Sequence, residues 1–211
     1  MKSTITCLSI VLFLLLSSCT TIPSTEPIGS KKIKLDKTDW NGLWKYSLGD
    51  SKKDEKQYLI IKVRNAEEGI LNIGLIDNVS GGDGIDTDGD KDKFSIKNFP
   101  LMAREHKDYS FFNVRARDFE NDEKVETLKK INQENNYYWC FFERIENAIF
   151  LYFPDEEFFK SNNLLKEIDL GNGETFSKLT ADSKTLSDNI VDNIYQVNSR
   201  KYPHLLLTRV R

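Results

Sequence analysis

The sequence predicts an α+β protein in which a β-rich antiparallel sheet or incomplete barrel is accompanied by two helices in the C-terminal half. Aromatic residues make up 11% of the 211-residue chain, whereas it has only 2 Met and 5 Pro, and this composition is typical of a β-rich core. Apolar and polar residues alternate through most of the first two thirds. Near the C-terminus, apolar residues instead recur every three or four positions, which favours helix.

The strand signals lie in the first two thirds of the chain. Alternating apolar residues over 58–64 and 71–75 predict two strands, and the polar stretch 65–69 predicts the turn that joins them into a hairpin. The same pattern predicts further strands at 44–48, 94–99, 109–115, 137–145 and 148–153. Glu146 and Asn147 predict a tight turn between the last two, because Asn tolerates left-handed backbone geometry.

The helix signals lie in the last third. Pro154, followed by acidic residues, predicts a short helix with the proline at its first position and the carboxylates near the positive end of the helix dipole. The Asp-Ser pair at 182–183 predicts the cap of a longer helix over 183–198. Its apolar face is formed by Leu186, Ile190, Ile194 and Val197. The unbroken apolar run within 204–210 predicts a closing strand inside the sheet.

Residues 1–18 have the features of a secretory signal, with Lys2, a short apolar run and two serines before a cysteine. The segment Leu16-Ser17-Ser18-Cys19 resembles the lipobox of bacterial lipoproteins. The resemblance implies that Cys19 carries acyl groups such as palmitate and attaches the protein to a membrane of the bacterial cell envelope. Thr20 stands where retention at the inner membrane goes with Asp, so the resemblance implies the outer membrane.

Composition divides the rest of the chain into two parts. Residues 19–37 are rich in Thr, Ser, Pro, Gly and Lys, which predicts a flexible tether, and residues 38–211 then form a single β-rich globular domain. With Cys7 removed and Cys19 acylated, Cys140 is the remaining thiol, so no intramolecular disulfide is expected. Its aromatic neighbours predict that Cys140 is a small buried side chain.

An acidic segment near the middle of the chain is the candidate metal site. Asp86, Asp88 and Asp90 occupy alternate positions, which is how loops present carboxylates to Ca²⁺. The segment resembles the start of an EF-hand loop, but Lys91 and Lys97 stand where that loop needs Gly and a bidentate Glu. The alternative is a solvated acidic loop between two strands, with at most weak cation binding.

The residues Gly42-x-Trp44 resemble the opening motif of lipocalins and related calycin barrels. In that family the Trp closes one end of the barrel and packs near an Arg of the last strand, so the resemblance implies Arg209 as its partner. The chain departs from the family pattern because its longer helix precedes the closing strand instead of following it.

Aromatic residues occur in pairs along the predicted strands, as at Phe111-Phe112 and Phe141-Phe142, so large rings point to both faces of the sheet. Both faces must therefore be covered, one by the sheet's own core and the other by the helix over 183–198. Filled in this way, the sheet is expected to enclose no cavity of about 300 Å³ or more, the lower range for ligand sites.

No catalytic motif and only 2 His are present, so we expect a non-enzymatic module that binds a protein or another envelope component at the membrane surface, with no cofactor. A net charge of −3 argues against a nucleic-acid partner. A lipocalin-like carrier of a small apolar ligand is one alternative. An enzyme whose site is assembled from scattered residues is the other.

Overall fold

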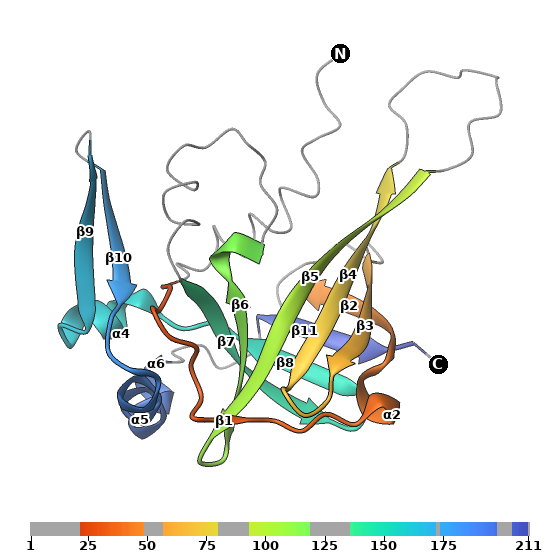
Figure 1. Cartoon of the computed structure of the whole chain (residues 1–211), viewed down its shortest axis with the longest axis horizontal. Helices are drawn as coiled ribbons and strands as arrows, with labels where there is room; N and C mark the ends of the chain where they lie inside the picture. Colours follow the sequence, from red (N-terminus) through yellow and green to blue (C-terminus); the bar gives the residue numbers. More distant parts are fainter. Residues whose placement is uncertain are drawn as a thin grey trace.

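Eight antiparallel strands close into a barrel in the computed structural model, which describes residues 22–48, 57–79, 93–118, 136–171, 174–197 and 204–210 (Figure 1). The barrel strands are β2 (Gly42–Leu48), β3 (Gln57–Asn65), β4 (Ile70–Val79), β5 (Lys93–His106), β6 (Tyr109–Arg115), β7 (Tyr137–Ile145), β8 (Ala148–Tyr152) and β11 (Leu205–Arg209). From β2 to β8 each strand pairs with the next one along the chain, and β11 pairs with both β8 and β2. The prediction of an internal closing strand is therefore confirmed.

The barrel is closed, not incomplete as predicted, because β5 pairs along its length with two strands. Its first ten residues pair with β4, and its last five, Met102–His106, pair with β6. A two-residue strand, β1 (Lys31–Lys32), also pairs with β5. Met102 pairs with both neighbours, so β4 and β6 lie on opposite edges of β5, and the β5–β6 pairing joins the two ends of the strand order into a ring. Alternation of apolar residues gives no sign of this pairing.

The barrel interior is apolar. Inward side chains from all eight strands form one buried cluster, together with residues from the segment that precedes β2. Its buried members are Leu35, Trp40, Trp44, Tyr46, Leu59, Ile61, Leu71, Ile73, Ala103, Phe112, Cys140, Phe142, Ile149, Leu151, Leu205 and Leu207. Burial of each large side chain contributes about 1.5–3 kcal/mol, so this cluster is the main source of barrel stability.

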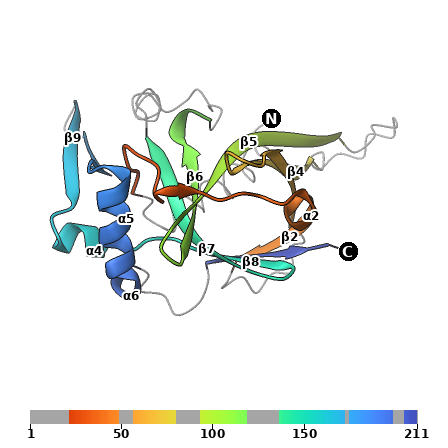
Figure 2. The same cartoon turned by 60° about the horizontal axis from the view of Figure 1, so that its bottom comes forward.

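A second layer covers the outside of β6 and β7 (Figures 1 and 2). It consists of the helices α4 (Glu156–Ser161), α5 (Ser183–Asp192) and α6 (Ile194–Val197), together with the chain segment 22–30. Phe111 and Phe141 point into this layer, whereas their neighbours Phe112 and Phe142 point into the barrel. The expectation that both faces of these strands are covered is confirmed.

The helix termini follow from local capping. Asp155 caps α4 by accepting from the Glu157 N–H at 3.0 Å, so Pro154 precedes the cap and does not take the first helical position as predicted. Asp182 caps α5 by accepting from the Thr185 N–H at 2.9 Å, as predicted. The helix predicted over 183–198 is interrupted at Asn193, where α5 ends and α6 begins.

The chain has a β-hairpin that the sequence pattern did not indicate. Strands β9 (Leu165–Gly171) and β10 (Glu174–Leu179) pair with each other and project away from the barrel, and one bridge joins Leu179 to Ser24 (Figure 1). Lys and Glu neighbour the apolar residues throughout this stretch, so the alternation that marks the other strands is hidden.

Residues 22–36 are packed, whereas composition predicts a flexible tether over 19–37. Ile22, Ser24, Ile28 and Leu35 are each less than 4% exposed. The few apolar residues of this segment are thus placed where they can be buried, and the predicted tether does not describe this part of the chain.

Candidate functional site

The two ends of the barrel are built differently. We call the end at Gly42 and Arg209, beside the short helix α2 (Lys37–Trp40), the plugged end. The opposite end, where β6 stops at Arg115 and β7 begins, is the loop end. Strands at the plugged end are joined by the tight connections 66–69, 107–108 and 146–147. The connections at the loop end are longer and span 49–56, 80–92 and 116–136.

Trp40 fills the plugged end from inside. Asp36 caps α2 through the Thr38 N–H, and the helix ends at Trp40, which is 5% exposed. Its ring lies edge-on to Phe112 and Phe142, with both centroid distances 5.9 Å. These two phenylalanines are stacked at 3.8 Å. The interior next to α2 is therefore filled by three aromatic rings in favourable geometry.

Two arginines close the plugged end over Trp40. The Arg144 guanidinium lies 5.3 Å from the Trp40 ring centre and pairs with Asp39 at 3.0 Å. Arg209 donates from Nη1 to the Thr38 carbonyl at 2.9 Å, and its backbone lies opposite Trp44 in the strand register. The Trp44 indole donates to the Trp40 carbonyl at 3.2 Å.

These contacts agree with what the Gly42-x-Trp44 resemblance implies. Trp44 is fully buried near the plugged end, and Arg209 lies beside it on the last strand. A Cβ added to Gly42 would lie 3.1 Å from the Arg209 Nε, so the glycine leaves room for the guanidinium. The position of the longer helix before β11 still departs from the family pattern.

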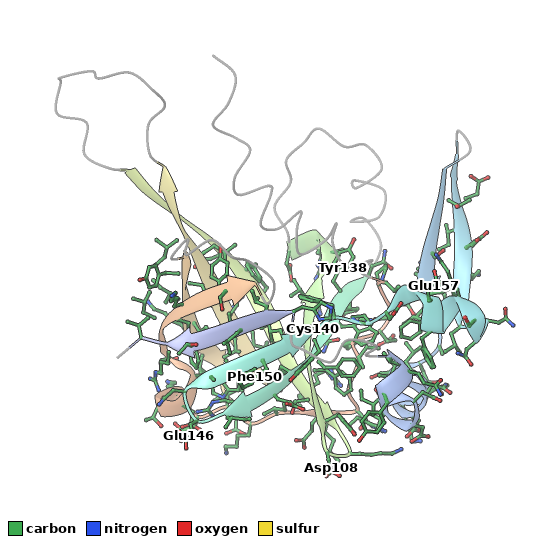
Figure 3. The ribbon with its side chains drawn as sticks, turned by 180° about the vertical axis from the view of Figure 1, so that it is seen from behind. Asp108, Tyr138, Cys140, Glu146, Phe150 and Glu157 are labelled. Carbon is green, nitrogen blue, oxygen red and sulfur yellow. The ribbon has the colours of Figure 1, made fainter. Side chains whose placement is uncertain are left out.

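The loop end has no comparable plug among the described residues. Leu75, Phe99 and Phe153 pack against the interior cluster there and remain partly exposed. Phe153 lies edge-on to the His204 ring at 5.5 Å, and its N–H donates to the His204 Nδ1 at 3.1 Å. Burial raises the pKa of the Tyr138 hydroxyl, which lies at the loop end of β7 (Figure 3). An apolar rim with partial exposure can bind an apolar group by removing it from water.

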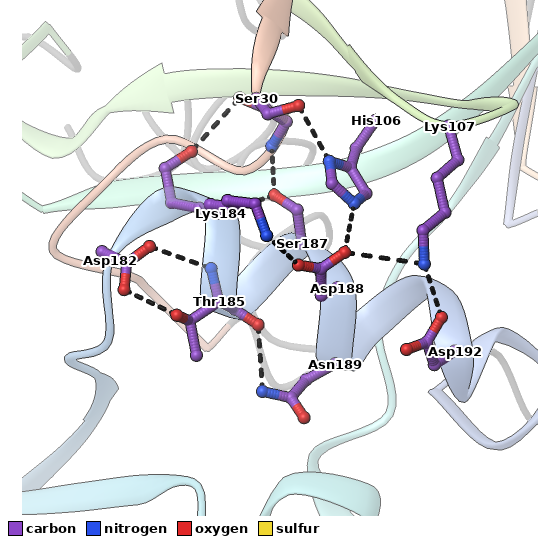
Figure 4. A network of polar contacts seen from close by, with 12 residues as sticks. Ser30, His106, Lys107, Asp182, Lys184, Thr185, Ser187, Asp188, Asn189 and Asp192 are labelled. Carbon is purple, nitrogen blue, oxygen red and sulfur yellow. Dashed lines mark hydrogen bonds and ion pairs between the residues drawn. The ribbon is translucent and has the colours of Figure 1, made fainter.

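A chain of polar contacts centred on His106 lies outside the barrel (Figure 4). The His106 Nδ1 is 2.8 Å from the Ser30 Oγ, and the His106 Nε2 is 2.8 Å from the Asp188 Oδ1. His106 is only 7% exposed. Lys184 donates to the Asp188 carboxylate at 2.8 Å. This hydrogen bond, followed by that from His106, holds the pKa of Asp188 well below its usual range.

The His106 cluster joins three segments that are distant in sequence. Ser30 belongs to the N-terminal segment, His106 ends β5, and Asp188 lies on α5. Nearby, the Gly29 N–H donates to the Ser187 Oγ at 2.8 Å, which adds a second link between the first segment and the helix. No local signal could have indicated these contacts, because the partners are separated by 76 residues or more.

The N-terminal segment is also fixed directly to the barrel. The Asn113 side chain accepts from the Ile28 N–H at 2.7 Å and donates to the Ile28 carbonyl at 2.9 Å. Gly29 has φ of +103°, and a Cβ there would lie 2.6 Å from the Arg104 Cβ. Only glycine fits this close approach without displacing the strand.

Cys140 is buried in the barrel interior, as predicted. Burial raises the pKa of its thiol to about 12. The thiolate is therefore scarce at neutral pH, and nucleophilic chemistry at this residue is disfavoured.

The other sequence-predicted site residues, Cys19 and the carboxylates Asp86, Asp88 and Asp90, lie outside the described residues. Acylation and weak cation binding stay predictions. Within the described ranges, no three or more His, Cys, Asp and Glu side chains are grouped in a way that could hold a metal ion. The helices of the same ranges include none that is long and apolar enough to cross a membrane.

Comparison with known proteins gives no significant match to a family model, a curated protein or a solved structure. The calycin resemblance therefore rests on the closed meander barrel and on the arrangement of Gly42, Trp44 and Arg209 at its plugged end.

Proposed function

We propose that the chain is a lipid-anchored protein of the bacterial cell envelope that binds the apolar part of an envelope component at the loop end of its barrel. Attachment comes from acyl groups on Cys19, and the protein performs no chemistry on what it binds. The observation that carries the proposal concerns the interior at the two ends. The Trp40 ring fills the plugged end, where Ile33 and Val63 are also partly exposed, whereas no such ring among the described residues covers Leu75, Phe99 and Phe153 at the loop end.

The chemistry of the lining selects the kind of ligand. The described interior cluster consists of aliphatic and aromatic side chains with Cys140, so a charged group would lose its hydration there without gaining a partner. An apolar group gains about 25 cal/mol for each Å² removed from water. An acyl chain or another hydrocarbon moiety is therefore the ligand class that fits.

A lipocalin-like carrier is a variant of this proposal in which the barrel encloses the apolar ligand. The family arrangement at Gly42, Trp44 and Arg209 supports it. The rings of Trp40, Phe112 and Phe142 occupy the plugged end, so an enclosed ligand would have to lie nearer the loop end. Native mass spectrometry of the purified chain distinguishes the versions, since a carrier retains a stoichiometric apolar ligand and a surface binder does not.

The binding experiment uses the chain from residue 20 onward and the fluorescent apolar probe N-phenyl-1-naphthylamine. We expect saturable binding that weakens about tenfold in Phe99→Ala and Phe153→Ala, because about 1.4 kcal/mol of contact is lost. Tyr195→Ala is the matched control, since Tyr195 is 90% exposed on α6. No binding, or equal binding by all the variants, would contradict the proposal.

An enzyme is the second candidate, and the contacts of Ser30, His106 and Asp188 favour it. In that reading the Ser30 Oγ bonds to an ester carbonyl carbon while the His106 Nδ1 accepts its proton, and the Asp188 carboxylate orients the imidazole. The imidazolium then gives this proton to the alcohol oxygen as the ester carbon–oxygen bond breaks and the alcohol leaves. A fluorophosphonate probe tests it directly. We expect no labelling that depends on Ser30, because Lys184 and Lys107 also engage Asp188 and the cluster fastens three segments. Labelling lost in Ser30→Ala and in His106→Ala would establish the enzyme instead.

A further inference from the structure

We infer that the loop end of the barrel faces the lipid bilayer. The inference rests on the proposed acylation of Cys19 and follows from how little chain separates that residue from the packed domain. Thr20 and Thr21 alone stand between Cys19 and Ile22, which is 3% exposed. Three Cα–Cα steps span at most about 11 Å. Ile22 must therefore lie within about 11 Å of the acylated residue.

Ile22 lies at the loop end. The next residues form backbone hydrogen bonds there, with the Ser24 N–H donating to the Tyr137 carbonyl at 2.9 Å and the Tyr137 N–H donating to the Ser24 carbonyl at 2.8 Å. Tyr137 is the first residue of β7. On the other side, the Leu179 N–H donates to the Pro23 carbonyl at 2.9 Å. The start of the packed chain is thus held between the barrel and the base of the β9–β10 hairpin.

The plugged end is too distant for the acyl anchor to reach. β7 runs from Tyr137 to Ile145, and the eight steps between its nine residues, at about 3.4 Å each, extend roughly 27 Å. Tyr138 and Glu146 mark the two ends in Figure 3. The β9–β10 hairpin and the ends of β4 and β5 project toward the same side as the start of the packed chain (Figure 1).

If the barrel lay on its side on the membrane, α5 would face the lipid. The charges of α5 make this contact unfavourable. Asp182, Asp192 and Lys184 lie on its exposed side and cap, and Lys107 pairs with Asp188 and Asp192, so this surface is charged and well hydrated. At the loop end, the Arg115 guanidinium instead lies 5.7 Å from the ring centre of Tyr137. Such side chains suit a headgroup region, since each combines an apolar body with a polar tip.

The charges around Ile22 do not provide the attachment by themselves. Among the described residues of this end, Arg115 and Arg117 are matched by Glu26 and Asp118, so these charges balance. The acyl groups therefore supply the affinity, and the short connection supplies the orientation. As a consequence, the partly exposed rim with Phe99 and Phe153 is held next to lipid, and its ligand is a molecule resident in the bilayer.

The test uses the acylated full-length mature chain in vesicles of phosphatidylethanolamine and phosphatidylglycerol. An environment-sensitive fluorophore is attached at Thr175→Cys, on the hairpin, or at Asp108→Cys, in the turn at the plugged end. Both positions are exposed, and the buried Cys140 is not labelled. With a nitroxide on the lipid headgroup, we expect strong quenching at residue 175 and little at residue 108. Equal quenching, or stronger quenching at residue 108, would overturn the inference.

Two further variants separate this inference from the proposed anchor. A Gly-Ser insertion of about twelve residues between Thr21 and Ile22 can span tens of Å, so the protein should stay on the vesicles while the quenching contrast disappears. Contrast that survives the insertion would overturn the role of the short connection. The Cys19→Ala variant should not bind the vesicles. If it stays bound, the proposed anchor fails, whereas equal quenching in an attached protein refutes only the orientation.

Discussion

The plugged end and the loop end of the barrel differ in how their interiors are closed. At the plugged end, α2 places the Trp40 ring edge-on to the stacked Phe112 and Phe142, and Arg144 and Arg209 bind over it. At the loop end, Phe99 and Phe153 remain partly exposed. The difference is the basis for our proposal that the loop end binds a ligand, although the same strands form both ends.

Removing the plug should have the largest effect. Trp40→Ala deletes a buried ring with two edge-on aromatic contacts, and we expect a loss of about 3–5 kcal/mol in the free energy of unfolding. Urea denaturation followed by circular dichroism measures it. Tyr195→Ala should change stability by less than about 0.5 kcal/mol. A loss below about 1 kcal/mol in Trp40→Ala would mean that this end is not closed by the indole.

The His106 cluster supports the plugged end from outside, so its removal should have the next largest effect. His106→Ala leaves Ser30 and Asp188 without their shared partner, and we expect a loss of about 1–3 kcal/mol. Lys107→Ala removes only exposed ion pairs and should have a smaller effect than His106→Ala. Equal losses in the two variants would show that the buried histidine does not fasten these segments.

The carboxylate of that cluster predicts an acid dependence. The pKa of Asp188 is lowered from 3.8 in the folded chain, so its contribution to stability is fully present above that value and is lost as the pH falls below it. Urea midpoints of the parent and of Asp188→Asn should therefore differ at neutral pH and converge in acid. A difference that stays constant down to about pH 2 would contradict the ion pairing.

The smallest expected effect concerns the reactivity of the Cys140 thiol, because this thiol becomes accessible only when the barrel opens. With its pKa raised to about 12 by burial, the thiol should not react with a disulfide reagent in the native chain and should react on unfolding. Trp40→Ala should expose it to the reagent at lower urea than Tyr195→Ala does. Fast reaction in the native parent would show that the interior is accessible from one end.

Local patterns predicted most of the strands and the capping of α5 by Asp182, because alternation and capping act over a few residues. The two-sided packing of Phe111 and Phe112 was also predictable, since neighbouring strand residues face opposite ways. Closure of the barrel was not, because it depends on the pairing of β6 with the last five residues of β5. The packing of residues 22–36 was hidden by a linker-like composition with few apolar residues.

The candidate site was predicted only in part. Trp44 and Arg209 were expected to meet, and they lie opposite each other in the register. The contacts of Ser30, His106 and Asp188 were not expected, because each partner comes from a different element and no short motif contains them. The partly exposed rim at Phe99 and Phe153 could be recognised only in the three-dimensional structure, because the sequence does not distinguish a half-exposed phenylalanine from a buried one.

A backbone amide NMR titration of the chain from residue 20 onward with dodecanoate tests the central claim most directly. We expect shifts at the loop end, around Leu75, Phe99 and Phe153, with the plugged-end amides of Gly42 and Glu146 unchanged. Shifts confined to the plugged end, or no shifts at any concentration below micelle formation, would contradict the assignment of the loop end as the binding end.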